Sequence, residues 1–195
     1  MTSRVLVALT GASGVLYGVR LVQRLVEAGE GVDVVLSRPA GKVLGIEHGL
    51  PGDPAAWFPE GAPDNLFVHA PDDIAAPPAS GSHAPRAMIV APCSMGTAAR
   101  IATGISGNLI ERSADVMLKE KRPLVIVPRE TPLSTIHLRN LLTLSEAGAS
   151  IVPAMPAFYT KPKDLEDMLA FVVDRALQSA GVELPLRHVW REDAP

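Results

Sequence analysis

One stretch near the start of the chain, a glycine-containing turn between an apolar run and an amphipathic run, most constrains the fold of this sequence. Residues 5–9, VLVAL, are continuously apolar and rich in β-branched side chains, which is typical of a strand buried on both faces. Residues 15–27 carry apolar side chains at helical spacing. Between them, Gly11 and Gly14 allow a tight turn and close approach to a ligand, because no Cβ intervenes. The pattern predicts a strand–turn–helix whose helix N-terminus, with the Ser13 hydroxyl, binds a phosphate.

This turn does not match the common nucleotide-binding fingerprints. Gly11, Gly14 and Gly18 are three and four positions apart, which differs from G-x-G-x-x-G, and no P-loop lysine follows. A tight strand–helix turn with a capping serine accounts for the same residues without any ligand. From these residues alone, a phosphate-binding turn and a purely structural turn are therefore both possible.

Strand and helix patterns alternate along the rest of the chain. Further strands are expected at residues 32–37, 65–69, 87–91, 124–127 and 151–152. Helices are expected within residues 39–49 and at residues 97–103, 109–121, 134–147 and 165–180. Apolar strands that alternate with helices predict a doubly wound parallel sheet of the α/β class, and 195 residues predict a single domain over residues 1–195.

Residues 50–86 interrupt this alternation. Eight of the 18 prolines of the chain lie there, which excludes a long regular helix from most of the segment. A long proline-rich segment without regular structure inside a compact domain more often has a function than not. We expect it to form a lid or a subunit contact.

Composition narrows the classes of partner. A net charge of −3 without a basic run argues against nucleic acid, and no apolar stretch is long enough to span a membrane. The first strand begins at residue 5, so we expect no signal peptide and a cytoplasmic location. The single cysteine, Cys93, excludes an intrachain disulfide. No cluster of His, Asp and Glu has metal-ligand spacing, so we expect an anion to be held without a dedicated metal.

Polar residues gather just after the expected strands. They lie at residues 11–14, at Ser37, at residues 93–97 and at residues 128–131. Because the carboxyl ends of parallel strands meet at one edge of a sheet, these residues should lie close together. Hydroxyl groups, helix N-termini and arginine are the usual groups that bind a phosphorylated ligand.

Five longer motifs then make the chain recognisable. They are TGASG at 10–14, APPASGS at 76–82, PCSMGT at 92–97, NLIERSADVMLKEKRPLVIVPRETP at 108–132 and FYTKP at 158–162. In this order, they resemble the UbiX family of flavin prenyltransferases, essentially from end to end. The resemblance implies a Rossmann-like three-layer α/β/α fold and a homo-oligomer, commonly a dodecamer. It also implies a metal-independent enzyme that joins dimethylallyl phosphate to reduced FMN at N5 and C6, producing prenylated FMN for UbiD-type decarboxylases.

The resemblance also implies roles for individual residues. The FMN-binding set is Gly11, Ala12, Ser13, Ser37, Ser94, Met95, Gly96, Thr97 and Arg129. The set around the prenyl phosphate is Arg112, Lys119, Arg129, Glu130, Tyr159 and Arg175, some of them reaching across a subunit boundary. The catalytic set is Ser13, Glu47, Glu130 and Tyr159, in which Ser13 and Glu47 would manage a flavin proton.

Each of these residues also has a simpler structural explanation. Arg112 and Lys119 lie on an amphipathic helix and fit a solvated face. Glu130 fits a local ion pair with Arg129, and Tyr159 fits a packed loop aromatic. The resemblance, rather than the spacing, favours the functional roles.

The chain departs from the family at one wall of the prenyl pocket. Relatives often carry tryptophan where this chain has Ile74, within DDIAAPPASG. Trp190, near the end of the chain, is a candidate match to a second aromatic of the family.

Three other functions are possible for a chain of this fold class. A flavin-dependent decarboxylase of cysteine-containing peptides or of phosphopantothenoylcysteine shares the fold class, but the P-x-M-N-x-x-M-W segment is missing. A nicotinamide oxidoreductase would have an acidic end to its second strand, where this chain has Ser37 and Arg38. A non-catalytic FMN carrier would not need Glu47, Lys119, Glu130 and Arg175 together.

Overall fold

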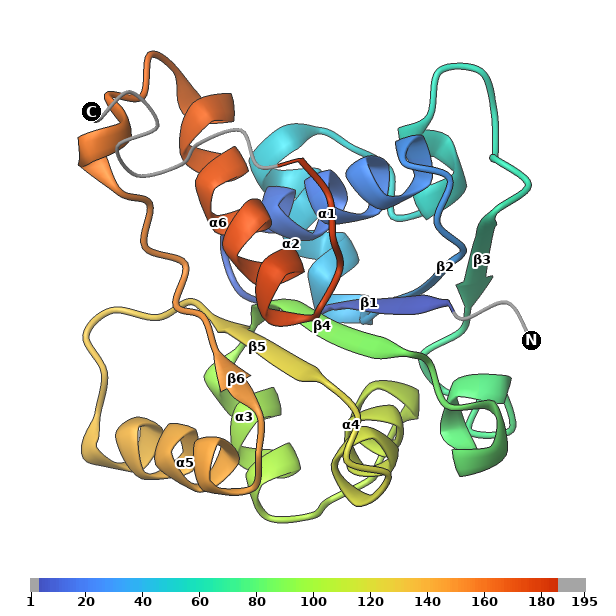
Figure 1. The fold of residues 1–195 in the computed structure, drawn as a ribbon, viewed down its shortest axis with the longest axis vertical. Helices are drawn as coiled ribbons and strands as arrows, with labels where there is room; N and C mark the ends of the chain where they lie inside the picture. Colours follow the sequence, from blue (N-terminus) through green and yellow to red (C-terminus); the bar gives the residue numbers. More distant parts are fainter. Residues whose placement is uncertain (1–3, 186–195) are drawn as a thin grey trace.

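The computed structural model describes residues 4–185, which form a six-stranded, all-parallel sheet with helices on both faces (Figure 1). The strand order is β3-β2-β1-β4-β5-β6. The strands are β1 (Val5–Leu9), β2 (Val32–Leu36), β3 (Leu66–His69), β4 (Ala87–Cys93), β5 (Leu124–Pro128) and β6 (Ser150–Ile151). The doubly wound parallel sheet and all six expected strands are confirmed.

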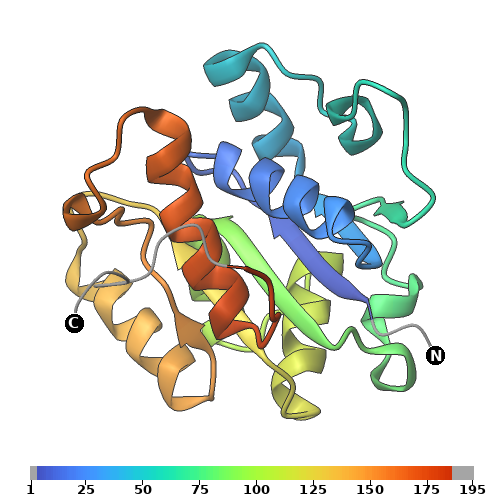
Figure 2. The same cartoon turned by 45° about the horizontal axis from the view of Figure 1, so that its top comes forward.

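The helices form two outer layers (Figures 1 and 2). They are α1 (Leu16–Glu27), α2 (Arg38–His48), α3 (Met95–Ala102), α4 (Leu109–Lys119), α5 (Thr135–Glu146) and α6 (Leu165–Ser179). Helices α1, α2 and α6 lie on one face of the sheet, and α3, α4 and α5 lie on the other. This arrangement confirms the three-layer α/β/α fold.

Side-chain alternation along the strands builds a separate core on each face. In β1, Val5, Val7 and Leu9 pack against α1 and α6, while Leu6 and Ala8 face the side of α3, α4 and α5. All five side chains are fully buried, as expected of a central parallel strand. The double burial explains why the strand reads as a continuous apolar run.

Several element bounds differ from the sequence expectation because of polar caps. Ser37, expected to end a strand, is instead the N-cap of α2 and accepts a hydrogen bond from the Ala40 N–H at 3.2 Å. Ser94 caps α3 in the same way, so that this helix begins at Met95 rather than at Thr97. Strand β4 continues to Cys93, two residues beyond its expected end.

The proline-rich segment forms short 3₁₀ turns around β3. The turns are Pro54–Trp57, Pro77–Ala79 and Gly81–His83. The Pro77–Ala79 turn packs against α4, where Arg112 Nε donates to the Ala79 carbonyl at 3.2 Å. The end of the segment therefore covers α4, whereas the Pro54–Trp57 turn packs against α1 and β3. No helix between residues 4 and 185 is long and apolar enough to cross a membrane.

Candidate functional site

The buried hydroxyl of Thr10 joins the carboxyl ends of β1 and β4, and a backbone hydrogen bond joins β1 to the end of β2. Thr10 Oγ1 donates to the Pro92 carbonyl at 2.8 Å and accepts from the Ser94 N–H at 2.7 Å. Next to it, the Ser37 N–H donates to the Leu9 carbonyl at 3.0 Å. These bonds gather the turns that follow three strands, as the sequence predicts. Thr10 itself is outside the predicted site set, although it lies in the same motif.

The first turn requires glycine for two different reasons. Gly14 adopts φ of +90°, a conformation that other residues rarely take. At Gly11, an added Cβ would lie 2.4 Å from Pro39 Cβ, so only glycine lets this turn approach the start of α2. Helix α1 then begins at Leu16 without any side-chain cap. The Tyr17 and Gly18 N–H groups donate to the Gly14 and Val15 carbonyls, so α1 offers an anion mainly the positive end of its helix dipole.

Glu47 lies against this turn. Its Oε2 accepts from the Gly14 N–H at 3.1 Å, and its carboxylate also accepts from the Ser13 hydroxyl. Partial burial alone would raise the pKa of Glu47, but these two hydrogen bonds and the charges of His48 and Arg129 outweigh it and lower the pKa. The structure therefore brings together Ser13 and Glu47, and the Glu47 carboxylate is ionised at neutral pH.

Arg129 supplies positive charge at the same edge. It directly follows β5, and its backbone N–H donates to the Cys93 carbonyl at 3.3 Å. The positive charge of its guanidinium helps to lower the pKa of Glu47. Burial raises the pKa of Tyr17, and the Arg129 charge partly opposes that rise. Tyr17 is outside the predicted set. Its position three residues after Gly14, on the first turn of α1, is the sequence signal for it.

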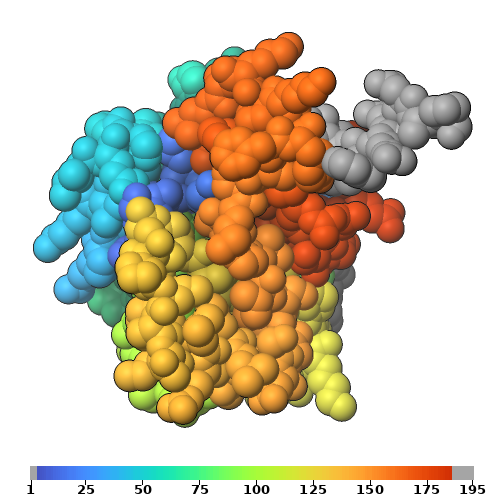
Figure 3. Space-filling model, turned by 90° about the vertical axis from the view of Figure 1, so that its left-hand side faces the viewer, coloured from blue at the N-terminus to red at the C-terminus, as the bar shows by residue number. Residues whose placement is uncertain are grey.

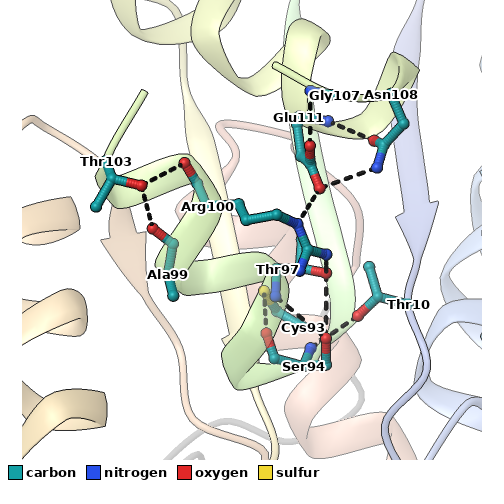
Figure 4. Close-up of polar contacts among 10 residues, drawn as sticks. All are labelled: Thr10, Cys93, Ser94, Thr97, Ala99, Arg100, Thr103, Gly107, Asn108 and Glu111. Atoms are coloured by element: carbon teal, nitrogen blue, oxygen red, sulfur yellow. Dashed lines mark hydrogen bonds and ion pairs between the residues drawn. The ribbon is translucent and has the colours of Figure 1, made fainter. Parts of the chain in front are cut away.

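The Ser94–Thr97 turn forms the other side of the edge (Figure 4). Ser94 Oγ accepts from the Thr97 N–H at 3.3 Å and donates to Thr97 Oγ1 at 3.1 Å. Met95 and Thr97 are each 5% exposed, so their side chains are fixed by packing. Burial raises the pKa of the Cys93 thiol to about 12, which excludes a thiolate nucleophile at this strand end.

Comparison with known proteins identifies the family. A family model described as Flavoprotein matches residues 1–177. Flavin prenyltransferase UbiX from Halalkalibacterium halodurans is 50% identical over 192 residues, covering 96% of this chain and 93% of that protein. Flavin prenyltransferase UbiX from Pseudomonas aeruginosa is 46% identical over 197 residues, covering 97% and 94%. This chain belongs to the UbiX family of flavin prenyltransferases.

Solved structures agree with this family. AnUbiX (PadA1), crystallised in complex with FMN and dimethylallyl pyrophosphate, has a TM-score of 0.86 and 39% identity, over 98% of this chain and 100% of that chain. A dodecameric FMN-dependent UbiX-like decarboxylase from Escherichia coli has a TM-score of 0.88 and 43% identity, over 96% and 99%. A PPC decarboxylase with a TM-score of 0.63 is 20% identical and shares the fold alone. The UbiX resemblance is confirmed over the cysteine-decarboxylase alternative.

Two residues of the UbiX phosphate set lie away from this edge within one chain. Lys119 ends α4 and pairs with Glu120, beside Gly81 and near the amino ends of the strands. The five residues of β5 separate this end from Arg129, about 16 Å at the usual strand rise. Arg112 pairs with Asp115 at 2.8 Å and bonds to the Ala79 carbonyl. Within one chain, Lys119 therefore does not reach Arg129, and Arg112 is held by Asp115 and the Ala79 carbonyl.

Tyr159 and Arg175 of the same UbiX set both lie near Phe171. The Tyr159 ring packs edge-on against Phe171, with centroids 6.0 Å apart, and Arg175 lies one turn further along α6. Phe171 and Arg175 line one cavity of about 310 Å³ beside β6. The loop that carries Tyr159 starts next to the end of β5, where the Ala154 N–H donates to the Pro128 carbonyl at 3.2 Å.

The remaining predicted positions are exposed or outside the described residues. Glu130 is exposed, and its Oε1 accepts from the Thr131 N–H at 2.9 Å. Among the described residues it forms no ion pair with Arg129, so the simple ion-pair explanation is wrong. Ile74 is 63% exposed, and Trp190 lies outside the described residues.

Proposed function

We propose that this chain joins dimethylallyl phosphate to reduced FMN at N5 and C6, and that a UbiD-type decarboxylase uses the product. Membership of the UbiX family supports the reaction class. One observation connects the proposal to particular residues. Ser13, Glu47 and Arg129 lie together at the carboxyl edge of the sheet, where the Ser94–Thr97 turn also lies.

The donors at this edge fit FMN. Helix α1 starts without a side-chain cap, whereas Ser37 and Ser94 cap α2 and α3. The start of α1, with the positive end of its helix dipole, suits a phosphate dianion, and Ser13 lies in the turn beside it. Thr97 offers its hydroxyl proton to an acceptor-rich ring edge, and Ser94 fixes the turn that carries it. The FMN set implied by the family, from Gly11 to Arg129, therefore lies on turns that face one another.

The charges at the edge fit prenyl transfer. Cleavage of the allylic C–O bond leaves a phosphate dianion, which the Arg129 guanidinium stabilises. Bound FMN supplies the nucleophilic ring atoms and a π face for the allyl fragment. Glu47, ionised at neutral pH, can accept a proton through Ser13. The family resemblance assigns Glu130, the residue after Arg129, to proton exchange with the leaving phosphate.

Arg112 and Lys119 fit this reaction only if another copy of the chain supplies them. In one chain they turn toward the Pro77–Ala79 and Gly81–His83 turns, away from Arg129. Helix α5, on the side of the molecule shown in Figure 3, carries three exposed apolar side chains, Ile136, Leu138 and Leu142. Exposed apolar side chains grouped on one element are typical of an interface. We therefore include a homo-oligomer, with the dodecamer of the Escherichia coli relative as its form, in the proposal.

A cytoplasmic location also belongs to this proposal. The substrates it names are FMN and a prenyl monophosphate, both charged and water-soluble, and neither needs a membrane surface.

A two-arm assay tests the proposal against the cysteine-decarboxylase alternative. With reduced FMN and dimethylallyl phosphate, we expect consumption of FMN and release of inorganic phosphate. With a cysteine-terminated peptide and oxidised FMN, we expect no release of carbon dioxide. EDTA should leave the first arm unchanged, because cationic side chains already neutralise the phosphate. Peptide decarboxylation without phosphate release would reject the proposal.

A further inference from the structure

Glu111 is a buried carboxylate that the proposed reaction does not use. It is 2% exposed, on the first turn of α4 (Figure 4). Its oxygens accept from the Gly107 N–H at 2.8 Å, from Asn108 Nδ2 at 2.9 Å and from Arg100 Nε. A buried charge needs such partners, so Glu111 holds the Arg100 guanidinium in one orientation.

The other end of that guanidinium reaches the FMN turn. Arg100 Nη2 donates to Thr97 Oγ1 at 3.3 Å. Its Nη1 lies 3.4 Å from the position that a Cβ on Gly96 would occupy. Arg100 therefore lies against two residues of the predicted FMN set, and it ties them to α4.

The direction of the Arg100–Thr97 hydrogen bond determines what the Thr97 hydroxyl can offer a ligand. Arginine can only donate, so Thr97 Oγ1 accepts from Arg100. The same oxygen accepts from Ser94 Oγ, which fills its two acceptor positions. The Thr97 hydroxyl proton is then left to donate. Arg100 thus favours Thr97 as a hydrogen-bond donor to an acceptor on a bound ligand.

We infer that Arg100, fixed by the buried Glu111, is a positioning residue for FMN that acts through the Thr97 hydroxyl. The inference rests on the proposed function, because FMN is the ligand that the Ser94–Thr97 turn would bind. A role limited to joining α3 and α4 would not require the contact with Thr97.

The test compares FMN dissociation constants from fluorescence titration of the full chain. In Arg100→Lys, a single ammonium cannot reach both Glu111 and Thr97, so we expect roughly threefold weaker binding. In Arg100→Leu/Glu111→Gln, both charges are removed, which avoids a bare buried carboxylate, and we expect about tenfold weaker binding. If the double variant fails to fold, Arg100→Lys decides the question alone.

A matched control and a mutant cycle separate positioning from stability. Arg20→Leu/Glu166→Gln removes another arginine–glutamate pair, between α1 and α6, and should leave FMN affinity unchanged. In a Thr97→Val background, Arg100→Lys should have almost no further effect, because the two residues act through one hydroxyl. Wild-type affinity in Arg100→Lys, or independent effects of Thr97 and Arg100, would overturn the inference. A wild-type chain that does not bind FMN would instead reject the proposed function.

Discussion

At the scale of single residues, the site depends on contacts between side chains far apart in the sequence. Glu47 meets the Gly14 N–H across 33 positions, and Arg129 acts on both Glu47 and Tyr17. The Ser13–Glu47 pair was implied by the family resemblance, and the Arg129 edge was predicted from the rule for parallel strand ends. Thr10, Tyr17 and Arg100 were not predicted, because contacts from other elements, such as Pro92 for Thr10 and Glu111 for Arg100, give them their roles.

Glu47 predicts a pH-dependent stability. Its pKa in the folded chain lies below the ordinary value of 4.5, so the ionised carboxylate stabilises the fold above pH 4.5. That contribution is lost as the pH falls below 4.5 through the lowered pKa. The difference in melting temperature between wild type and Glu47→Gln should therefore be larger at neutral pH than near about pH 3.5. Glu60→Gln, on an exposed loop, controls for the lost charge. A pH-independent difference would contradict the assigned cause.

Glu130→Gln separates binding from turnover. The amide keeps the shape of the carboxylate but loses its basicity, so FMN affinity should stay at the wild-type value. Loss of acid–base help should slow turnover by about 10²–10⁴-fold. Single-turnover prenylation beside an FMN titration measures both quantities. A wild-type rate would show that Glu130 has only a structural role.

At the scale of elements, apolar runs and caps account for most of the fold. The central strands β1, β4 and β5 are fully buried and read as continuous apolar segments, which is why they were predicted from the sequence. The errors lie at element ends, where Ser37 and Ser94 act as helix caps and β4 runs on through Pro92. The orientation of Arg112 and Lys119 on α4 was not predictable, because amphipathic spacing does not say which neighbour covers the polar face.

Gly18 tests how closely α1 must pack on the sheet. A Cβ there would lie 2.3 Å from the Ala91 carbonyl oxygen and 2.4 Å from Leu9 Cδ2, so Gly18→Ala must move α1 and its N-terminus. We expect a loss of about 1–3 kcal/mol in the free energy of unfolding. Gly45→Ala is the matched control, because nothing lies within 4 Å of its Cβ, and the helix propensity of alanine should stabilise α2 slightly. Thermal melts with equal effects in both variants would contradict this packing.

At the scale of the whole molecule, the proposal requires more than one chain at each site. Arg129 lies at the carboxyl end of β5, and Lys119 lies beyond its amino end. An oligomer can bring the Lys119 of one chain to the Arg129 of another, whereas the monomer cannot.

Mixed assemblies test the shared site. Arg129→Ala and Lys119→Ala should each be inactive alone. Refolded together at equal amounts, they should regain activity in about a quarter of the sites, because a random assembly places two intact residues together that often. Mixing the preformed oligomers without refolding is the control. No recovery after refolding would show that both residues act within one chain, which contradicts the shared site.

The most direct test of the central claim is the mass of the flavin after reaction. The chain is incubated anaerobically with reduced FMN and dimethylallyl phosphate, without added metal. The flavin is then released from the protein, and its mass is measured by mass spectrometry. We expect a flavin heavier by C5H8, because the dimethylallyl group replaces one hydrogen, formed together with inorganic phosphate. Unmodified FMN, from a chain that binds FMN, would contradict it.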